Sequence, residues 1–293
     1  MITNSLFKEV NLCGAYKIAS EIINLFNCKD IKEELDLFLS LDAREADEFL
    51  VNLIHTHLDC IMKPQKVSLL HFFISEYIEV FIGNEIYCTE DVLIDIDDYD
   101  TLIGSLQNAL TLINDEEWKN DELGKLEVIF QNRDDENIDF DDSIKKLRDE
   151  LTLLENKAAE GIAELTENIF FLLYSNKGFL YDFNLVISDT IKSHHFDEDI
   201  YDDSGHIKRC TSRPKWFENA ILFRDKCICQ HCGKDLSPIL TVPQLGELTY
   251  DHVIPLEKGG TNDSTNFQLL CRHCNSIKND SLCKPSYRYQ MFW

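Results

Sequence analysis

Apolar residues recur three and four positions apart through most of the first two hundred residues. The spacing runs through Leu6, Val10, Ala15, Ile18, Ile22 and Phe26, and again through Phe49, Leu53, His57 and Ile61. Such a period is typical of helices that bury one face. Proline, which ends helices, occurs once before residue 214, at Pro64. We therefore predict that residues 1–193 form an all-helical domain of about seven or eight helices.

The same pattern predicts one long helix near the end of this region. Residues 134–142 are strongly acidic and predict a linker, after which Ser143 is a candidate cap for a helix that reaches Tyr174. A heptad pattern with a four-residue stutter runs through Ile144, Leu147, Leu151, Leu154 and Ala158, then Ile162, Leu165, Ile169 and Leu172. Both a dimerising coiled coil and a core helix of a bundle fit this pattern. The core helix is favoured because only about two heptads lie on each side of the stutter.

A different pattern appears in the last third of the chain. Residues 248–254 are rich in β-branched and aromatic side chains and predict a short strand, and Gly259 and Gly260 mark the loop that follows. Residues 266–270 predict a second strand, and residues 271–279 a helix. The predicted fold class is mainly α, with an all-helical domain over 1–193, an exposed acidic linker over 194–205 and a small α+β domain over 206–293.

Charge divides the chain near the same boundary. Residues 206–293 contain 12 Lys and Arg against 8 Asp and Glu, whereas residues 1–205 contain 16 against 45. The net charges of +4 and −29 sum to the −25 of the whole chain. Because like charges repel, we expect the acidic part to avoid nucleic acid and the basic part to approach its phosphates. The predicted nucleic-acid surface is therefore confined to the second part.

Composition narrows the class of protein further. Hydrophobic residues make up 44% of the 293 residues, which is enough for a core in two domains. The amino terminus lacks a basic segment followed by an apolar one, and no apolar run approaches the ~20 residues that a membrane span needs. We expect a soluble, cytoplasmic protein without membrane partners, whose eleven cysteines are reduced or bound to metal.

Four of these cysteines form two C-x2-C pairs, Cys229 with Cys232 and Cys271 with Cys274. Each pair can turn around a metal ion and present both sulfurs from one side, so the four predict a tetrahedral structural Zn²⁺ site. The 38 residues between the pairs leave room for a complete substructure. Cys227 is an alternative ligand to Cys229, although C-x2-C is the better geometry.

The residues around these cysteines resemble the HNH endonuclease family, particularly its members with a zinc knuckle of this spacing. The resemblance rests on residues 250–260, which read YDHVIPLEKGG, and on residues 266–278, which read NFQLLCRHCNSIK. The stretches 213–217 and 223–226 fit as well, so the resemblance covers about residues 206–285. The family core is a ββα-metal finger, which implies this fold for the small domain.

The resemblance also implies roles for four residues. His252 is the general base, Asn266 orients the loop that carries His252, and Asp251 and Asn275 hold a catalytic divalent metal ion. Asn275 stands where the family often has histidine. Oxygen ligands suit Mg²⁺ or Mn²⁺ better than Zn²⁺, and histidine has the near-neutral pKa that a base for water needs. The family reaction breaks the P–O3′ bond and leaves 5′-phosphate and 3′-hydroxyl ends.

We therefore expect a metal-dependent HNH DNA endonuclease that nicks or cuts both strands. The predicted DNA contacts are Lys278, Arg272, Arg213 and Lys215, with Lys208, Arg209, Arg224 and Arg288 as further basic residues available to phosphates. The acidic helical domain is expected to regulate cutting, to recruit a protein partner or to form a homodimer. The architecture suggests an antiviral or restriction-type effector. Two alternatives stay open: a zinc-stabilised module that binds nucleic acid without cutting it, and an interaction protein that acts through the helical domain.

Three further polar clusters have simpler interpretations. His194 and His195 could hold a metal ion with the acidic residues of the linker, but no apolar residue fixes their geometry, which favours an exposed linker. Residues 95–100 lack the glycine and glutamate of a calcium loop and predict an exposed turn or helix start. His55 and His57 lie in an apolar helix and are expected to be packed or partly buried.

Overall fold

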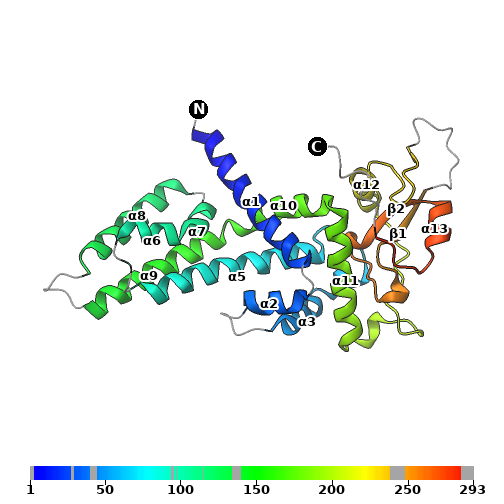
Figure 1. The fold of residues 1–293 in the computed structure, drawn as a ribbon, viewed down its shortest axis with the longest axis horizontal. Helices are drawn as coiled ribbons and strands as arrows, with labels where there is room; N and C mark the ends of the chain where they lie inside the picture. Colours follow the sequence, from blue (N-terminus) through cyan, green and yellow to red (C-terminus); the bar gives the residue numbers. More distant parts are fainter. Residues whose placement is uncertain are drawn as a thin grey trace. The chain divides into compact units, whose positions relative to one another are not determined.

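The fold is mainly α, as predicted (Figure 1). The computed structural model describes residues 3–27, 30–39, 45–93, 96, 98–113, 115–133, 140–237 and 248–284. Before residue 194 the described residues form eleven α-helices: α1 (Thr3–Asn27), α2 (Ile31–Leu39), α3 (Ala46–Thr56), α4 (Leu58–Met62), α5 (Leu69–Val92), α6 (Tyr99–Ser105), α7 (Gln107–Leu112), α8 (Glu116–Gln131), α9 (Phe140–Ala159), α10 (Ile162–Ser175) and α11 (Lys177–Ser193). The prediction of seven or eight was wrong because three continuous helical patterns are each divided into two helices, at His57, at Leu106 and between Ala159 and Ile162.

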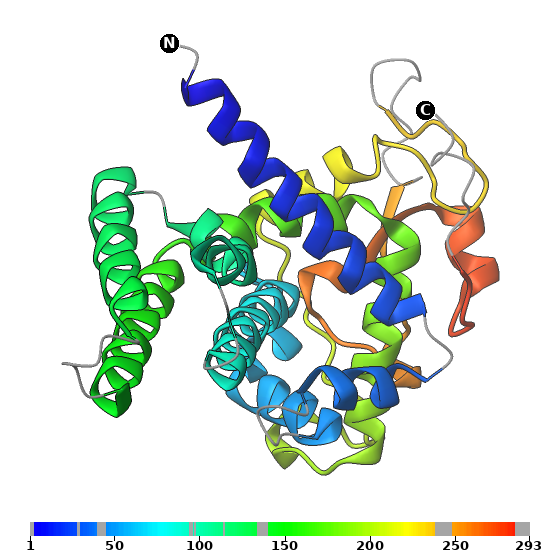
Figure 2. The same cartoon turned by 60° about the vertical axis from the view of Figure 1, so that its left-hand side comes forward.

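The predicted order of strand, loop, strand and helix is confirmed. Strand β1 (Leu248–His252) pairs antiparallel with β2 (Phe267–Cys271), and α13 (Arg272–Lys278) follows directly (Figures 1 and 2). The register places His252 opposite Phe267 and Leu248 opposite Cys271. None of the described helices combines the length and the apolar character that a membrane span requires.

Helix α12 (Lys215–Arg224) holds the hairpin from the side of β2. Phe217 and Ile221 of this helix are fully buried and form a core cluster with Phe267 and Leu269. The rings of Phe217 and Phe267 meet edge to face, with centroids 4.8 Å apart. Burial of these side chains stabilises the hairpin by about 1.5–3 kcal/mol per residue, so the lead-in helix is part of the hairpin's core.

Contacts along the chain divide it into two compact units, Met1–Ser20 with Ile74–Ile169 and Glu21–Phe73 with Phe170–Trp293. In the first unit, α9 packs against α7 and α8. Its apolar seam is buried through Ile144, Leu147, Leu151, Leu154 and Ala158. The heptad pattern therefore marks a core helix of the chain's own bundle, which is the interpretation that the sequence favoured over a dimerising coiled coil.

The long helix predicted from Ser143 to Tyr174 is wrong in its extent. Helix α9 ends at Ala159 and α10 begins at Ile162, so the break coincides with the stutter in the heptad pattern. At the break, a Cβ added to Gly161 would lie 2.3 Å from the carbonyl oxygen of Leu112. Only glycine permits so close an approach to the end of α7. Residues 134–139 of the predicted acidic linker lie outside the described residues, as do Asp95 and Asp97.

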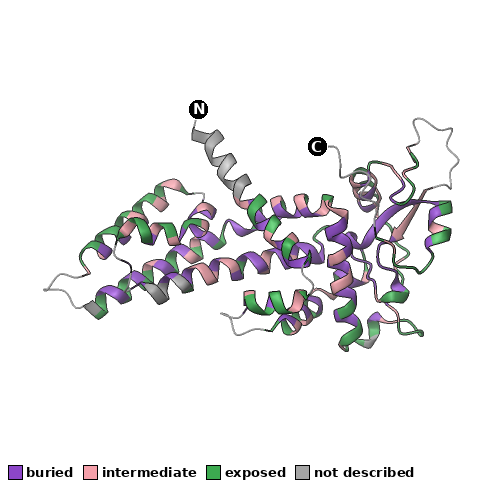
Figure 3. Cartoon of the chain, in the orientation of Figure 1, coloured by how far each residue is buried: buried purple, intermediate pink, exposed green. Residues whose placement is uncertain are grey.

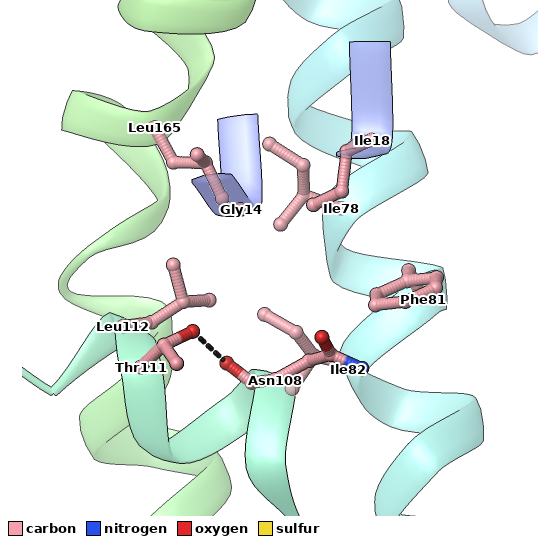
Figure 4. Close-up of a pocket in the computed structure, with 9 residues that line it drawn as sticks. All are labelled: Gly14, Ile18, Ile78, Phe81, Ile82, Asn108, Thr111, Leu112 and Leu165. Atoms are coloured by element: carbon pink, nitrogen blue, oxygen red, sulfur yellow. Dashed lines mark hydrogen bonds between the residues drawn. The ribbon is translucent and has the colours of Figure 1, made fainter. Parts of the chain in front are cut away.

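A small apolar cavity lies within the first unit (Figure 4). Its volume is about 20 Å³, and the side chains of Ile78, Leu112 and Leu165 point into it. A space of this size holds about one water molecule and no ligand. Gly14 of α1 lies in its wall, and nothing stands within 4 Å of a Cβ placed there.

Helix α11 forms the centre of the second unit. One side joins a cluster of phenylalanine rings with centroids 5.2 to 6.0 Å apart, made by Phe26, Phe49, Phe73, Phe179 and Phe183. Another side meets the end of β1, where Tyr181 packs against Val253 and Ile254. The helix is buried along most of its length (Figure 3). It therefore contacts both the helices of this unit and the end of β1.

The segment predicted as an exposed linker, residues 194–205, lies inside the second unit. Asp197, Asp199, Asp202 and Asp203 are exposed, but Phe196 and Ile200 are buried, and Tyr201 forms a β-bridge with Ile207. A short 3₁₀ helix, Glu198–Ile200, fixes the middle of the segment. The domain boundary assigned to this segment from the sequence stays a prediction.

Helix α5 begins with a cap assembled from distant parts of the chain. The backbone N–H of Ser68 donates to Nδ1 of His71 at 2.9 Å, so His71 takes the place that Glu usually has in a capping box. The N–H of Leu69 donates to Oδ2 of Asp263 at 2.8 Å. His71 is buried and stacks on Phe170, and burial lowers the pKa of His71 to about 4.

Two glycine substitutions in the first unit should have opposite effects on stability. Gly14→Ala adds a methyl group in open space and removes the entropic cost of glycine in a helix, which should stabilise the fold by about 0.5–1 kcal/mol. Gly161→Ala drives a methyl group into the Leu112 carbonyl and should destabilise it by about 1–3 kcal/mol. Urea midpoints for the two variants, measured beside the unchanged protein, check both signs. A neutral Gly161→Ala would contradict the packing at the α9–α10 break.

Stability should decline as the pH falls from 6.5 to 4, in part because of His71. An unfolded histidine has a pKa of about 6.5, whereas the pKa of folded His71 is about 4, so only the unfolded state takes up the proton in this window. The contribution is fully present above pH 6.5 and is lost by up to about 1.4 kcal/mol per pH unit below it. Urea unfolding at pH 7 and pH 5 should show a smaller loss for His71→Gln. Substitution of exposed His55 by Gln is the control, and equal losses in all three proteins would refute the assignment.

Candidate functional site

The four predicted zinc ligands lie together in the second unit. The sulfur atoms of Cys229, Cys232, Cys271 and Cys274 are all within 4.8 Å of one another, and those of Cys232 and Cys271 are 3.8 Å apart. Four sulfurs placed tetrahedrally ~2.3 Å from a Zn²⁺ ion would be about 3.8 Å apart. The cluster therefore fits a structural zinc site with four cysteine ligands. Cys227 is not part of the cluster, which decides between the two candidate ligands in favour of Cys229.

Backbone turns present each pair of sulfurs. The first pair sits in a turn closed by the N–H of Cys229, which donates to the carbonyl of Lys234 at 2.9 Å, and Gly233 adopts a left-handed φ of 78° there. The second pair spans the junction of β2 and α13, where Cys271 is the N-cap residue. Both turns are local, so the sequence spacing alone was sufficient to predict them.

Backbone donors also favour the ionised form of one ligand. Burial by itself would raise the pKa of Cys229, but N–H groups of Cys232, Cys271 and His231 directed at its sulfur lower it to about 7. A thiolate is the form that binds metal. The turn that positions this sulfur therefore also favours its thiolate form, which binds a metal ion.

Asp251, a predicted ligand of the catalytic metal ion, lies near the end of β1 and is held by two side chains. Nζ of Lys278 is 2.9 Å from its Oδ2, and Nε2 of Gln268 donates to the same oxygen at 3.3 Å. Lys278 also donates to the backbone carbonyl of His252 at 2.8 Å. The side chain of Lys278 is only 3% exposed, so this ammonium group is fixed to the end of β1.

Asn275, the other predicted ligand, lies in α13, which packs against β1. It precedes Lys278 by three residues, and residues three apart share one face of a helix. Because Lys278 reaches the end of β1, Asn275 lies on the face of α13 that is turned toward β1. Among the described residues, neither Oδ1 of Asp251 nor the side-chain amide of Asn275 makes a hydrogen bond. One carboxylate oxygen and one amide oxygen are thus available, which fits a hard divalent cation.

His252, the predicted base, is buried, with 4% of its surface exposed. Its ring packs on Phe267 with centroids 4.3 Å apart, and Nε2 is 3.3 Å from Oδ1 of Asn262. Burial lowers the pKa of His252 to about 3, and the positive charges of Arg209 and Lys278 act in the same direction. The imidazole is therefore neutral at physiological pH.

Asn266 closes the loop that follows His252. Its Oδ1 accepts the N–H of Ile254 at 2.8 Å, and its Nδ2 donates to the carbonyls of Ile254 and Thr261 at 3.0 and 2.9 Å. The side chain is fully buried. Gly260 lies beside the carbonyl of Ile254 with no room for a Cβ, so the loop also requires glycine at this position. The two ends of the loop are thereby held together.

Two residues that the sequence analysis did not single out hold this loop to the helices of the second unit. Asn262 donates from its backbone N–H to the carbonyl of Ile61, the residue before the end of α4, at 2.9 Å, and from Nδ2 to the carbonyl of Lys208 at 2.8 Å. Its Oδ1 accepts the N–H of Cys210 at 3.0 Å. Asp263 caps α5, as described above, and both side chains are fully buried. The only signal in the sequence was the uninterrupted polar run over residues 261–266.

The predicted DNA contacts divide into exposed and buried residues. Arg272, Arg213 and Lys215 are exposed, although Lys215 pairs with Glu218 at 3.4 Å. Lys278 is buried against Asp251.

Arg224 is not available to DNA, contrary to expectation. Its side chain is 4% exposed, pairs with Asp225 at 2.8 Å and also donates to the carbonyl of Phe267. It lies over the ring of Tyr174. The sequence could not distinguish this arginine from a surface one because its partners in the core, apart from Asp225, are distant along the chain.

Residues 229–281 match the family model of the HNH endonucleases. The match contains both cysteine pairs, the hairpin with His252 and Asn266, and all of α13. Comparisons with curated proteins and with solved structures returned no match. This part of the chain is therefore an HNH domain, as the resemblance in its sequence indicated.

The zinc site predicts one ion per chain, held by four specific thiols. Cys274→Ser should lose the ion and lower the melting temperature, because a structural zinc ion contributes directly to folding. Cys227→Ser should keep one zinc ion, since Cys227 lies outside the cluster. Zinc content by atomic emission, together with release to a chromogenic chelator, measures both. If zinc persisted in Cys274→Ser and was lost from Cys227→Ser, Cys227 and not Cys274 would be the zinc ligand.

Proposed function

We propose that the protein is a metal-dependent HNH endonuclease that hydrolyses phosphodiester bonds in DNA. The observation that carries this proposal is the hairpin itself. A strand that ends in Asp251 and His252 packs against a helix that bears Asn275, and the cysteine cluster lies where this helix leaves β2. Phosphodiester hydrolysis needs a base for water and a positive charge beside the phosphate, and these residues can supply the first and hold the second.

The hydrogen bonds of Asn262 assign the tautomer of His252. Nδ2 of Asn262 donates to a carbonyl and Oδ1 accepts a backbone N–H, which fixes the orientation of the amide. Oδ1 can only accept, so Nε2 of His252 carries the hydrogen and donates it. The lone pair of Nδ1 is then the site that takes a proton from water. The imidazole is neutral at physiological pH, which is the form that accepts a proton, but burial lowers its pKa below the near-neutral value expected from the sequence and makes it a weaker base.

Asp251 and Asn275 would hold the catalytic Mg²⁺ or Mn²⁺ ion. When bound, the ion would supply Lewis acidity and stabilise the charge that develops on the phosphate. Lys278 restrains Asp251 through Oδ2 and leaves Oδ1 as a ligand atom. The same ammonium holds the carbonyl of His252, so a single side chain positions both the ligand and the base. In this interpretation Lys278 positions the site and does not contact DNA.

The helices of the second unit support a regulatory role for the acidic region. The loop that follows His252 is bonded to α4 and α5, so a movement of these helices would displace Asn262 and with it the imidazole. A protein partner that moves the helices could thereby switch cutting. The proposal of an antiviral or restriction-type effector rests on this two-part architecture.

Plasmid cleavage tests the proposed activity. The intact protein with Mg²⁺ or Mn²⁺ should convert supercoiled plasmid to nicked or linear DNA, and His252→Ala should slow this by about 10²–10⁴-fold, the usual contribution of a general base. His273→Ala is the matched control, because His273 is exposed and lies outside the cysteine cluster. Equal loss in both variants would point to damaged folding.

The two alternatives, a binding module and an interaction protein, predict different results. A zinc-loaded, folded protein that binds DNA with the same affinity as its His252→Ala variant, and cuts under no condition, would be a binding module. A protein that neither binds nor cuts DNA would act through its helices. The intact chain is needed, because removal of residues 1–205 would leave Asn262 and Asp263 without Ile61 and Leu69.

A further inference from the structure

A groove in the second unit lies between the α4–α5 turn and the start of α12. Its volume is about 820 Å³, and its walls include His57, Lys66 and Phe72 on one side and Pro214 and Trp216 on the other. The groove is thus built from two segments that are about 140 residues apart in sequence. One segment belongs to the region predicted to repel nucleic acid.

Apart from residues 56–59, which include Asp59, both walls come from stretches without acidic residues. Residues 60–75 contain no Asp or Glu, although residues 1–205 contain 45, and they carry Lys63 and Lys66. Residues 204–217 likewise contain no Asp or Glu and carry four basic residues. Lys63 and Lys66 are exposed, as are Arg213 and Lys215. Of the described residues that line the groove, Asp59 alone is a carboxylate. The lining itself carries one lysine, Lys66, against Asp59, and the exposed Lys63, Arg213 and Lys215 next to lining residues add further positive charge. Together these four basic residues form a cationic strip along the groove in a strongly acidic chain.

This strip is joined to the proposed catalytic hairpin. Asn262 binds the carbonyl of Ile61, which follows Cys60 of one wall, and the carbonyl of Lys208, while its Oδ1 accepts from His252. Arg213, next to Pro214 of the groove, lies over the ring of Tyr250 with its guanidinium carbon 5.7 Å from the centroid. Tyr250 directly precedes Asp251. A chain of basic and aromatic side chains therefore runs from the groove to the hairpin.

We propose that this groove binds a DNA strand with unpaired bases, with its phosphates on Lys63, Lys66, Arg213 and Lys215 and a base stacked on Trp216. Cationic grooves with aromatic side chains bind single strands in this way, because every base has a face that can stack. The inference rests on the proposed function, because the groove would hold the DNA strand that the hairpin cuts. It makes the helical region part of the substrate site and predicts a preference for flaps, bubbles or single strands over duplex DNA.

Binding of labelled oligonucleotides without divalent metal tests the groove. A Lys63→Gln, Lys66→Gln double variant of the intact chain should lose roughly tenfold or more in affinity for single-stranded DNA at 0.1 M salt, and each lost contact should lower the salt slope by about 0.7. The control is Lys145→Gln with Lys146→Gln, which removes two exposed charges from α9. Equal affinity of the two double variants, or tighter binding to duplex than to single strands, would overturn the proposal.

Trp216 provides a second, independent readout. The chain has three tryptophans, so Trp118→Phe with Trp293→Phe leaves Trp216 as the single reporter. A saturating single strand should quench its fluorescence, and an abasic strand of the same length should bind without this quenching, because stacking needs a base. Equal quenching by both strands, or none by either, would contradict the stacking of a base on Trp216.

These experiments distinguish a failure of the groove proposal from a failure of the nuclease proposal. If plasmid is cut but the Lys63 and Lys66 double variant binds like its control, the groove proposal fails and the nuclease stands. If this variant loses binding as predicted but His252→Ala leaves cleavage unchanged, the nuclease assignment fails and the binding groove stands.

Discussion

The hydrogen bonds of Asn262 and Asp263 are the constraint on which the rest of the site depends. Asp263 caps α5 from 194 residues away, and Asn262 binds a carbonyl of α4 while it holds the imidazole of His252. All of these groups are buried, where an unmade hydrogen bond costs about 1–3 kcal/mol. The loop of the HNH domain and the start of two helices therefore form one polar network. The position of the His252 imidazole therefore depends on the helices as much as on the hairpin.

The cysteine cluster and Lys278 position the other parts of the site. The cysteine cluster joins the turn before the hairpin to the end of β2 and the start of α13, the helix that carries Asn275. Lys278 then fixes Asp251 and the backbone of His252 from that helix. Removing one partner of a buried ion pair is costly, by about 3–5 kcal/mol, because the other charge stays buried. The site is thus rigid where the metal ligand and the base must be placed.

The sequence predicted what depends on local spacing. Each cysteine pair, each short strand and the helix are encoded by local spacing, and the structure contains all of them. The cap on α5 was not, because Asp263 and Leu69 are adjacent only after folding. Arg224 looked like a surface arginine for the same reason. The extent of the long helix was wrong because periodicity continues across a break, and the reason for that break, the carbonyl of Leu112 beside Gly161, is a tertiary contact.

Hydrogen exchange in an Asp263→Ala variant tests most directly whether the helices hold the loop of His252. The account predicts that the amides at the start of α5, Leu69 to His71, and those of the loop from Val253 to Asn262 lose protection together, because they belong to one network. Protection lost only within residues 263–266, with α5 and the rest of the loop unchanged, would contradict it and leave the HNH domain independent of the helices.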